Sequence, residues 1–371
     1  MRFRPHRLSV VARVFAWSLV LTVAASAHAE EPLPPPAPPL TRSLYLLDVP
    51  FLHFGALERV SASTRPGFDV EIGYANTFSH SWHPNAIKVE FETLGRPFTR
   101  AEAEELHLRH SEDAIFFIDG EVTRVALRGS LRLDDALSVA LEVPYISFSA
   151  LHLDSGIESF HKAFGFADSE RENFPRGRFQ IVRQRPHGPL EFEDQTPSSG
   201  LGDATASLRF RREIGPRTSV GADLSLKLPT GSAGNYRGSG SLDAGLLAGV
   251  EHRLGATARY ALRLETAVVV PGRFRGDTAN TLEASTFLRV MAAAQARLGA
   301  KTFVSVAGVL EQSPFRTDTI PDEARSAVDV VLGVTRRLSE SSSVRLSIDE
   351  NLSKLGDAAD VTVALGFAFR P

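Results

Sequence analysis

The chain has 371 residues, no cysteine, and 41 basic against 44 acidic residues, which gives a formal net charge of −3. The absence of cysteine excludes a disulfide framework, a thiolate metal site and a cysteine nucleophile, and the acidic balance argues against a nucleic-acid partner. The 11 histidines form no HExxH or comparable pair, so we predict neither a metal site nor a cofactor.

The first 29 residues have the three parts of a secretory signal peptide. A start with three arginines is followed by an apolar stretch at residues 14–25 and by the small-residue cleavage motif Ala-His-Ala at residues 27–29. This motif predicts cleavage after residue 29, so that the mature chain begins at Glu30. Because the signal holds four arginines and no acidic residue, the mature chain has 37 basic against 44 acidic residues, a net charge of −7. The alternative is an uncleaved signal anchor, but Arg13 interrupts the apolar stretch.

Residues 30–66 are assigned as a proline-rich linker and an N-terminal periplasmic segment. Residues 32–39 read PLPPPAPP, a composition too rich in proline for a helix or a sheet and typical of an extended linker. Residues 41–66 fit either a short periplasmic segment or a plug that enters the domain formed by the residues that follow.

From residue 67 onward the chain alternates apolar and polar residues in strand-length segments. In residues 257–270 the even-numbered side chains are apolar apart from Thr266, whereas Arg259, Arg263 and Glu265 share the opposite face. A period of two with charges on only one face indicates a strand with different environments on its two sides. This pattern is typical of a transmembrane β-barrel, in which one face contacts lipid and the other the lumen.

The same pattern predicts about twelve strands, joined by short connections after every even-numbered strand and by longer polar loops elsewhere. They are residues 68–78, 114–133, 136–148, 201–213, 218–228, 241–254, 257–270, 283–298, 301–312, 325–338, 343–352 and 360–369. Short turns on one side, long loops on the other and an even strand number are features of bacterial outer-membrane barrels. We therefore predict an antiparallel up-and-down β-barrel over residues 67–371, located in the outer membrane.

Fourteen strands are the alternative, because residues 86–91 and 114–118 fit an additional pair. Between them, Thr99 and Glu102 form a capping box that predicts a helix over residues 99–110. The last predicted strand places alternate apolar side chains up to Phe369 on one face, and it resembles the C-terminal strand by which the outer-membrane assembly machinery selects its substrates. Here Arg370 and Pro371 follow the final aromatic residue.

Charges of both signs occupy the inward positions of the predicted strands. The lumen-lining candidates are Arg124, Arg128, Glu142, Asp223, Lys227, Arg259, Arg263 and Glu265. Some polar lining is required in any barrel, because charges cannot face lipid without a cost of roughly 2–4 kcal/mol near the midplane. The side chains fit either a lumen filled with ion pairs or a narrow pore whose charges set selectivity, and the sequence leaves both interpretations open.

One long connection, residues 150–200, is predicted to contain a helix. Ser155 caps this helix, Glu158 completes the capping box, and Gly165 ends it. Such a helix would either fold into the mouth of the barrel and constrict it or cover the surface as a lid.

The run LDSGIESFHKAFGFADSERENFPRGRF in this loop, together with the earlier IDGEVTRVALRGSLRL, resembles an uncharacterised bacterial family, domain of unknown function 3187. The resemblance implies an outer-membrane barrel. It implies no activity, because the family has none assigned. The polar positions that match the loop motif are Asp154, Glu158, His161 and Arg171.

Three functional hypotheses follow from this pattern. The leading one is a passive or gated pore for small solutes, with outer-membrane lipid and the barrel-assembly machinery as further partners. The second is a structural or surface-interaction barrel without transport. The third is a hydrolase with an active site at the rim, in which Glu158 and His161 act with Ser155 or Ser159; the chain has no GxSxG motif to support it.

Overall fold

The computed structural model of the protein describes residues 41–57, 66–82, 96, 99–150, 159, 162, 176–255, 258–275, 284–315, 326–353 and 359–370. Fifteen strands of this described part form a single antiparallel sheet. None of its helices is long and apolar enough to cross a membrane.

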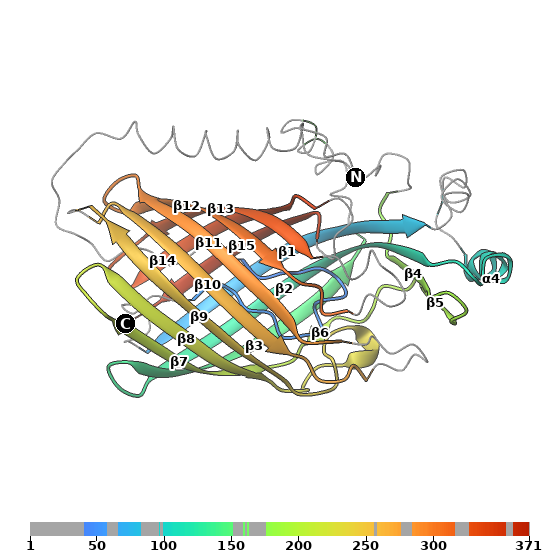
Figure 1. Cartoon of the computed structure of the whole chain (residues 1–371), viewed down its shortest axis with the longest axis horizontal. Helices are drawn as coiled ribbons and strands as arrows, with labels where there is room; N and C mark the ends of the chain where they lie inside the picture. Colours follow the sequence, from blue (N-terminus) through green and yellow to red (C-terminus); the bar gives the residue numbers. More distant parts are fainter. Residues whose placement is uncertain are drawn as a thin grey trace.

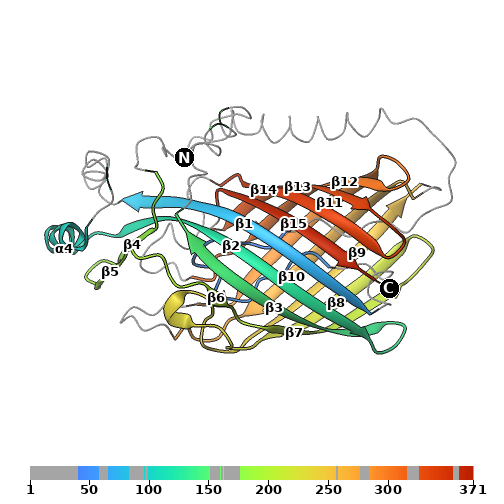
Figure 2. The same cartoon turned by 180° about the vertical axis from the view of Figure 1, so that it is seen from behind.

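Twelve of the described strands close into one barrel (Figures 1 and 2). In order around the ring they are β1 (Gly67–Trp82), β2 (Ile115–Arg132), β3 (Leu137–Ser149), β7 (Thr205–Glu213), β8 (Thr218–Lys227), β9 (Asp243–Leu254), β10 (Tyr260–Val270), β11 (Phe287–Arg297), β12 (Thr302–Glu311), β13 (Ala327–Arg337), β14 (Ser342–Asn351) and β15 (Val361–Phe369). Each strand pairs with the next, and β15 pairs with β1, with Phe369 opposite Phe68. The predicted up-and-down barrel of twelve strands is confirmed.

The connections between the barrel strands are short at one end and long at the other. Residues 133–136, 214–217, 298–301 and 338–341 form short turns, which lie at the same end of the barrel as the C-terminus (Figure 1). The long connections lie at the opposite end, and one of them contains the 3-10 helix η2 (Ala233–Asn235).

The two faces of the barrel wall have opposite chemistry. In β10, Leu262 and Leu264 are 49% and 54% exposed, whereas Arg263 and Glu265, which alternate with them, are 8% and 1% exposed. The outward-facing strand residues that are large, apolar and exposed include Ile72, Leu127, Leu141, Leu208, Leu224, Leu226, Leu246, Leu288, Val290, Leu310, Leu332, Leu346, Leu365 and Phe367. An apolar belt of this extent around a polar interior is the pattern of a barrel that faces lipid.

The end with long connections carries a small extension beyond the barrel (Figure 1). It consists of α4 (Arg100–Arg109) and the hairpin of β4 (Gln180–Gln184) and β5 (Leu190–Glu193). Residues 115–118, which the fourteen-strand alternative assigns to an additional strand, instead form the beginning of β2 and pair with β4. The other half of the additional pair, residues 86–91, lies outside the described residues.

The helix predicted from the capping box is present as α4. Thr99 donates its backbone N–H to Glu102 Oε2 at 2.8 Å, and Thr99 Oγ1 accepts from the Glu102 N–H at 3.3 Å. Hydrogen bonds from Arg96 and then from Thr99 lower the pKa of Glu102 to about 2. The cap therefore keeps its negative charge at the helix N-terminus at neutral pH.

Residues 41–57 lie inside the barrel and are called the plug below (Figure 1). The sequence leaves open either a periplasmic segment or a plug for residues 41–66, and the described residues 41–57 lie inside the barrel. Two apolar clusters hold the plug. The first contains Tyr45, Leu46, Leu47 and Phe51 with Phe179, Phe274 and Phe315 of the long connections. The second contains Leu52, Phe54 and Leu57 with Leu247, Val269 and Phe287 of the wall.

The residue that follows the last strand closes the seam between β15 and β1. Arg370 donates from Nη2 to Asp69 Oδ2 at 2.7 Å and from Nη1 to the carbonyl oxygen of Phe68 at 3.2 Å. The Arg370 side chain is 11% exposed and that of Asp69 is 4% exposed. The residue that follows the final aromatic residue, Phe369, thus has a structural role, because Arg370 links the first and last strands.

We expect Arg370→Ala to lower the free energy of unfolding of the barrel by about 1.5–3 kcal/mol, the usual range for a hydrogen bond to a charged group. Equilibrium unfolding in lipid vesicles measures this change. Arg132→Ala is the matched control, because Arg132 lies at the same end of the barrel but its side chain is 40% exposed. Equal losses in the two variants would contradict the role assigned to Arg370.

Candidate functional site

The plug is an irregular segment that enters the lumen as two arms joined by a turn. The turn is fixed by hydrogen bonds from the N–H groups of Asp48 and Val49 to the carbonyl of Tyr45, at 2.9 and 3.1 Å. Arg42 bridges the arms by donating from Nη1 to the carbonyl of His53 at 2.6 Å. Because this backbone is neither helix nor strand and lies within the barrel, its remaining polar groups need partners from the wall.

Charged side chains of the wall supply those partners. Asp243 Oδ2 accepts from the backbone N–H of Leu52 at 2.9 Å, and Glu265 accepts from the N–H of Leu57 at 3.1 Å. Arg263 donates to the carbonyl of the same Leu57. Part of the inward charge therefore binds the backbone of the plug.

One charge cluster lies between the first arm of the plug and the wall formed by β2 and β3. Glu142 of β3 is contacted by Arg124 and Arg128 of β2 and by Arg42 of the plug, with Arg42 Nη2 at 3.1 Å from Glu142 Oε1. Arg124 also lies 3.7 Å from Glu71 of β1. Glu142 thus keeps two arginine partners on the wall even without the plug.

Two further clusters involve β8. Lys227 binds Asp203 and lies 3.3 Å from Asp243 Oδ2, and all three side chains are at most 3% exposed. Closer to the short turns, Asp223 binds Arg211 at 2.6 Å and lies 3.9 Å from Arg209.

The next two strands of the wall, β9 and β10, carry a similar group. Arg263 binds Glu251 at 2.6 Å and Glu265 at 2.9 Å. Arg259 lies apart from this group, near a short turn, where Nε donates to the carbonyl of Arg297 at 3.3 Å. Of the eight lumen-lining candidates, seven are therefore placed in charge clusters inside the barrel and Arg259 at its end.

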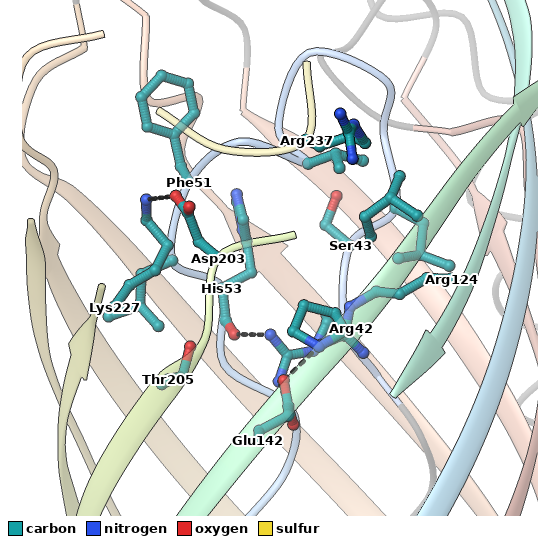
Figure 3. A pocket seen from close by; sticks show the side chains of 15 residues that line it. Arg42, Ser43, Phe51, His53, Arg124, Glu142, Asp203, Thr205, Lys227 and Arg237 are labelled. Carbon is teal, nitrogen blue, oxygen red and sulfur yellow. Dashed lines mark hydrogen bonds and ion pairs between the residues drawn. The ribbon is translucent and has the colours of Figure 1, made fainter. Parts of the chain in front are cut away.

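Two cavities remain between the plug and the wall formed by β3, β7 and β8. The first is lined by Asp203, Lys227 and Arg237 near the long connections (Figure 3). The second lies deeper, beside Ser207 and Ser225.

The two cavities meet at the plug. The residues that line both are Arg42, Leu52, His53, Glu142 and Thr205. In Figure 3 the hydrogen bond from Arg42 to Glu142 crosses from the plug to β3, and the hydrogen bond from Arg42 to the His53 carbonyl joins the two arms of the plug. A side-chain bridge from the plug to the wall therefore separates the cavities.

The loop-motif candidates Asp154, Glu158, His161 and Arg171 lie outside the described residues. The same holds for the helix predicted at residues 155–165, apart from Ser159 and Lys162. The site residues that sequence reasoning missed are those of the plug, chiefly Arg42. They were missed because the apolar residues of 41–57 recur with neither the strand period of two nor the helix period of 3.6, so the pattern does not indicate their contacts.

A closed antiparallel barrel with an apolar outer belt, a charged lumen and an internal plug defines an integral β-barrel membrane protein with the fold of outer-membrane channels. Residues 103–370 match the family model described as protein of unknown function DUF3187, and the chain belongs to this family. No curated protein matches the chain.

Solved structures similar to the chain include outer-membrane channels. An outer membrane channel from Pseudomonas putida F1 is 11% identical, with a TM-score of 0.50 over 85% of this chain and 96% of that chain. The toluene transporter TbuX of Ralstonia pickettii is 10% identical, with a TM-score of 0.39 over 84% of this chain and 91% of that chain. The first similarity shows a shared barrel fold at low sequence identity.

Proposed function

We propose that the protein is an outer-membrane pore for small solutes, gated by the plug. The observation that carries the proposal is the pair of cavities along the β3, β7 and β8 wall, which meet at the bridge between Arg42 and Glu142. Inward side chains beside the plug are small and polar at Thr205, Ser207 and Ser225, so displacing this bridge would join the two cavities.

The geometry of the bridge favours movement of the plug over disruption of the wall. Glu142 is held by Arg124 and Arg128 whether or not Arg42 is present, so withdrawal of Arg42 does not leave a buried carboxylate uncompensated. A wall carboxylate that keeps two arginine partners and a plug that is bound to the wall by hydrogen bonds are what a gate requires.

The cellular setting is part of the same proposal. Cleavage after residue 29 would release a mature chain beginning at Glu30, and the barrel-assembly machinery would insert it into outer-membrane lipid. The short turns would then lie in the periplasm and α4, β4 and β5 outside the cell, as in other outer-membrane barrels. The apolar belt and the turn asymmetry support this orientation.

We expect Arg42→Ala to raise the single-channel conductance of the protein in planar bilayers by several-fold, because the substitution removes the bridge at the junction of the cavities. Arg109→Ala is the matched control, since Arg109 lies on α4 with a 48% exposed side chain and should conduct like the wild type. If wild type and Arg42→Ala are both silent while heat-modifiable migration shows a folded barrel, the gate is not at this bridge.

A further inference from the structure

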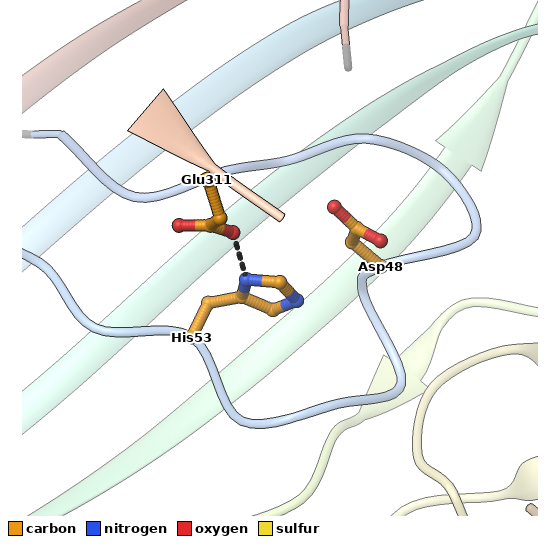
Figure 4. A group of neighbouring side chains, drawn as sticks. All are labelled: Asp48, His53 and Glu311. Carbon is orange, nitrogen blue, oxygen red and sulfur yellow. Dashed lines mark hydrogen bonds and ion pairs between the residues drawn. The ribbon is translucent and has the colours of Figure 1, made fainter. Parts of the chain in front are cut away.

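A buried group of three possible metal ligands joins the plug to β12. Asp48 lies in the turn of the plug, and His53 lies in the arm that follows this turn. Glu311 is the last residue of β12. Their ligand atoms all lie within 4.8 Å of one another (Figure 4). The three residues are 2%, 3% and 6% exposed.

The contacts of Glu311 fix the role of the His53 ring. Glu311 Oε1 lies 2.6 Å from His53 Nδ1, and Glu311 Oε2 lies 3.1 Å from Arg289 Nε. A carboxylate that is paired with an arginine accepts hydrogen bonds, so we assign the Nδ1 proton as the donor. In the neutral imidazole the other nitrogen, Nε2, then carries a free lone pair.

His53 Nε2 is buried and has no hydrogen-bond partner within the described part of the chain. The ring turns this nitrogen toward Asp48 (Figure 4), whose Oδ2 accepts a hydrogen bond from Ser43 Oγ at 3.1 Å. A buried nitrogen without a hydrogen-bond partner is destabilising, and a cation between His53 and Asp48 would give it a partner.

We propose that Asp48, His53 and Glu311 form a site for a divalent transition-metal cation of the Zn²⁺ type, which ties the plug to β12. His53 Nε2 and Asp48 are the direct ligands. Glu311 orients the imidazole through Nδ1, as the carboxylates behind metal-bound histidines do. The combination of imidazole nitrogen and carboxylate oxygen favours Zn²⁺ and similar cations over Ca²⁺ or Mg²⁺, which prefer oxygen ligands alone.

The geometry sets two conditions for the site. With bonds of about 2.1 Å, two ligands of one cation are at most about 4.2 Å apart, so His53 Nε2 and the Asp48 oxygen must lie within this distance once the cation is bound. His53 lines both cavities, which gives the cation a path from the lumen and leaves room for water to complete the coordination.

The test is Zn²⁺ binding by the folded protein, purified in detergent, stripped with a chelator and titrated against a competing indicator. We expect one Zn²⁺ to bind per wild-type chain in competition with the indicator, and this binding to be lost in His53→Gln and Asp48→Asn. We expect a 10–100-fold weaker affinity in Glu311→Gln, the range for removal of an orienting carboxylate. His107→Gln is the control, because His107 lies on α4 outside the barrel.

A wild-type protein that binds no Zn²⁺ at micromolar concentration, or Asp48 and Glu311 variants that bind it as tightly as the wild type, would overturn the proposal. Heat-modifiable migration of each variant verifies the barrel, and the Asp48 and Glu311 variants carry the test if His53→Gln does not fold. Because binding is measured without conductance, its failure leaves the proposed pore untouched.

Discussion

Replacing residues 41–57 by a glycine–serine segment of the same length should turn the protein into an open pore. The plug fills the lumen through two apolar clusters, and a flexible polar segment cannot reproduce them. We expect a single-channel conductance several-fold above that of the wild type and above that of Arg42→Ala, which removes one bridge only. Planar-bilayer recordings of the three proteins give the comparison.

The wall should survive this replacement. Two of its charge clusters pair without the plug: Arg263 binds Glu251 and Glu265, and Lys227 binds Asp203 and Asp243. Water that enters the lumen solvates them further. A folded variant with wild-type conductance would mean that another part of the chain closes the barrel, and the gating role of the plug would be wrong.

The second large effect concerns the outer face. We expect Leu264→Arg to lower the free energy of unfolding in lipid vesicles by about 2–4 kcal/mol, the cost of an arginine on the lipid face near the bilayer midplane. Leu264 lies in the middle of β10 and is 54% exposed, so in water alone the same substitution would be nearly neutral.

Leu108→Arg is the matched control, because Leu108 is 80% exposed on α4, beyond the end of the barrel. It should change the unfolding free energy by less than about 0.5 kcal/mol, the usual range for a surface substitution. Similar small effects in both variants would show that the belt around β10 does not contact lipid.

The strands could be predicted from the sequence because their two faces differ. Leu262 and Leu264 point outward and Arg263 and Glu265 inward, as the alternation in residues 257–270 predicts, and the strand itself begins at Tyr260. The alternation is missing in residues 115–118, because both faces of β2 are buried there. Ile115 and Phe117 pack in the cluster with α4, and Phe116 and Ile118 pack in the cluster with the plug.

The contacts of the plug could not be predicted in the same way. Its partners lie far along the chain, 191 residues from Leu52 to Asp243 and 258 residues from His53 to Glu311. The wall charges were predicted to face the lumen, but their partners depend on strand register and on a segment without periodicity. A motif search cannot find the group of Asp48, His53 and Glu311 either, because Glu311 lies far along the chain from the other two residues.

The position of the plug before β1 has a consequence for the order of folding. The plug precedes every barrel strand along the chain, yet its partners include Glu311 at the end of β12. Contacts between residues so far apart form slowly, because a long loop must close first. We therefore expect refolding to show two phases, in which strand pairing is completed before the fluorescence or proteolytic protection of residues 41–57 reaches its final value.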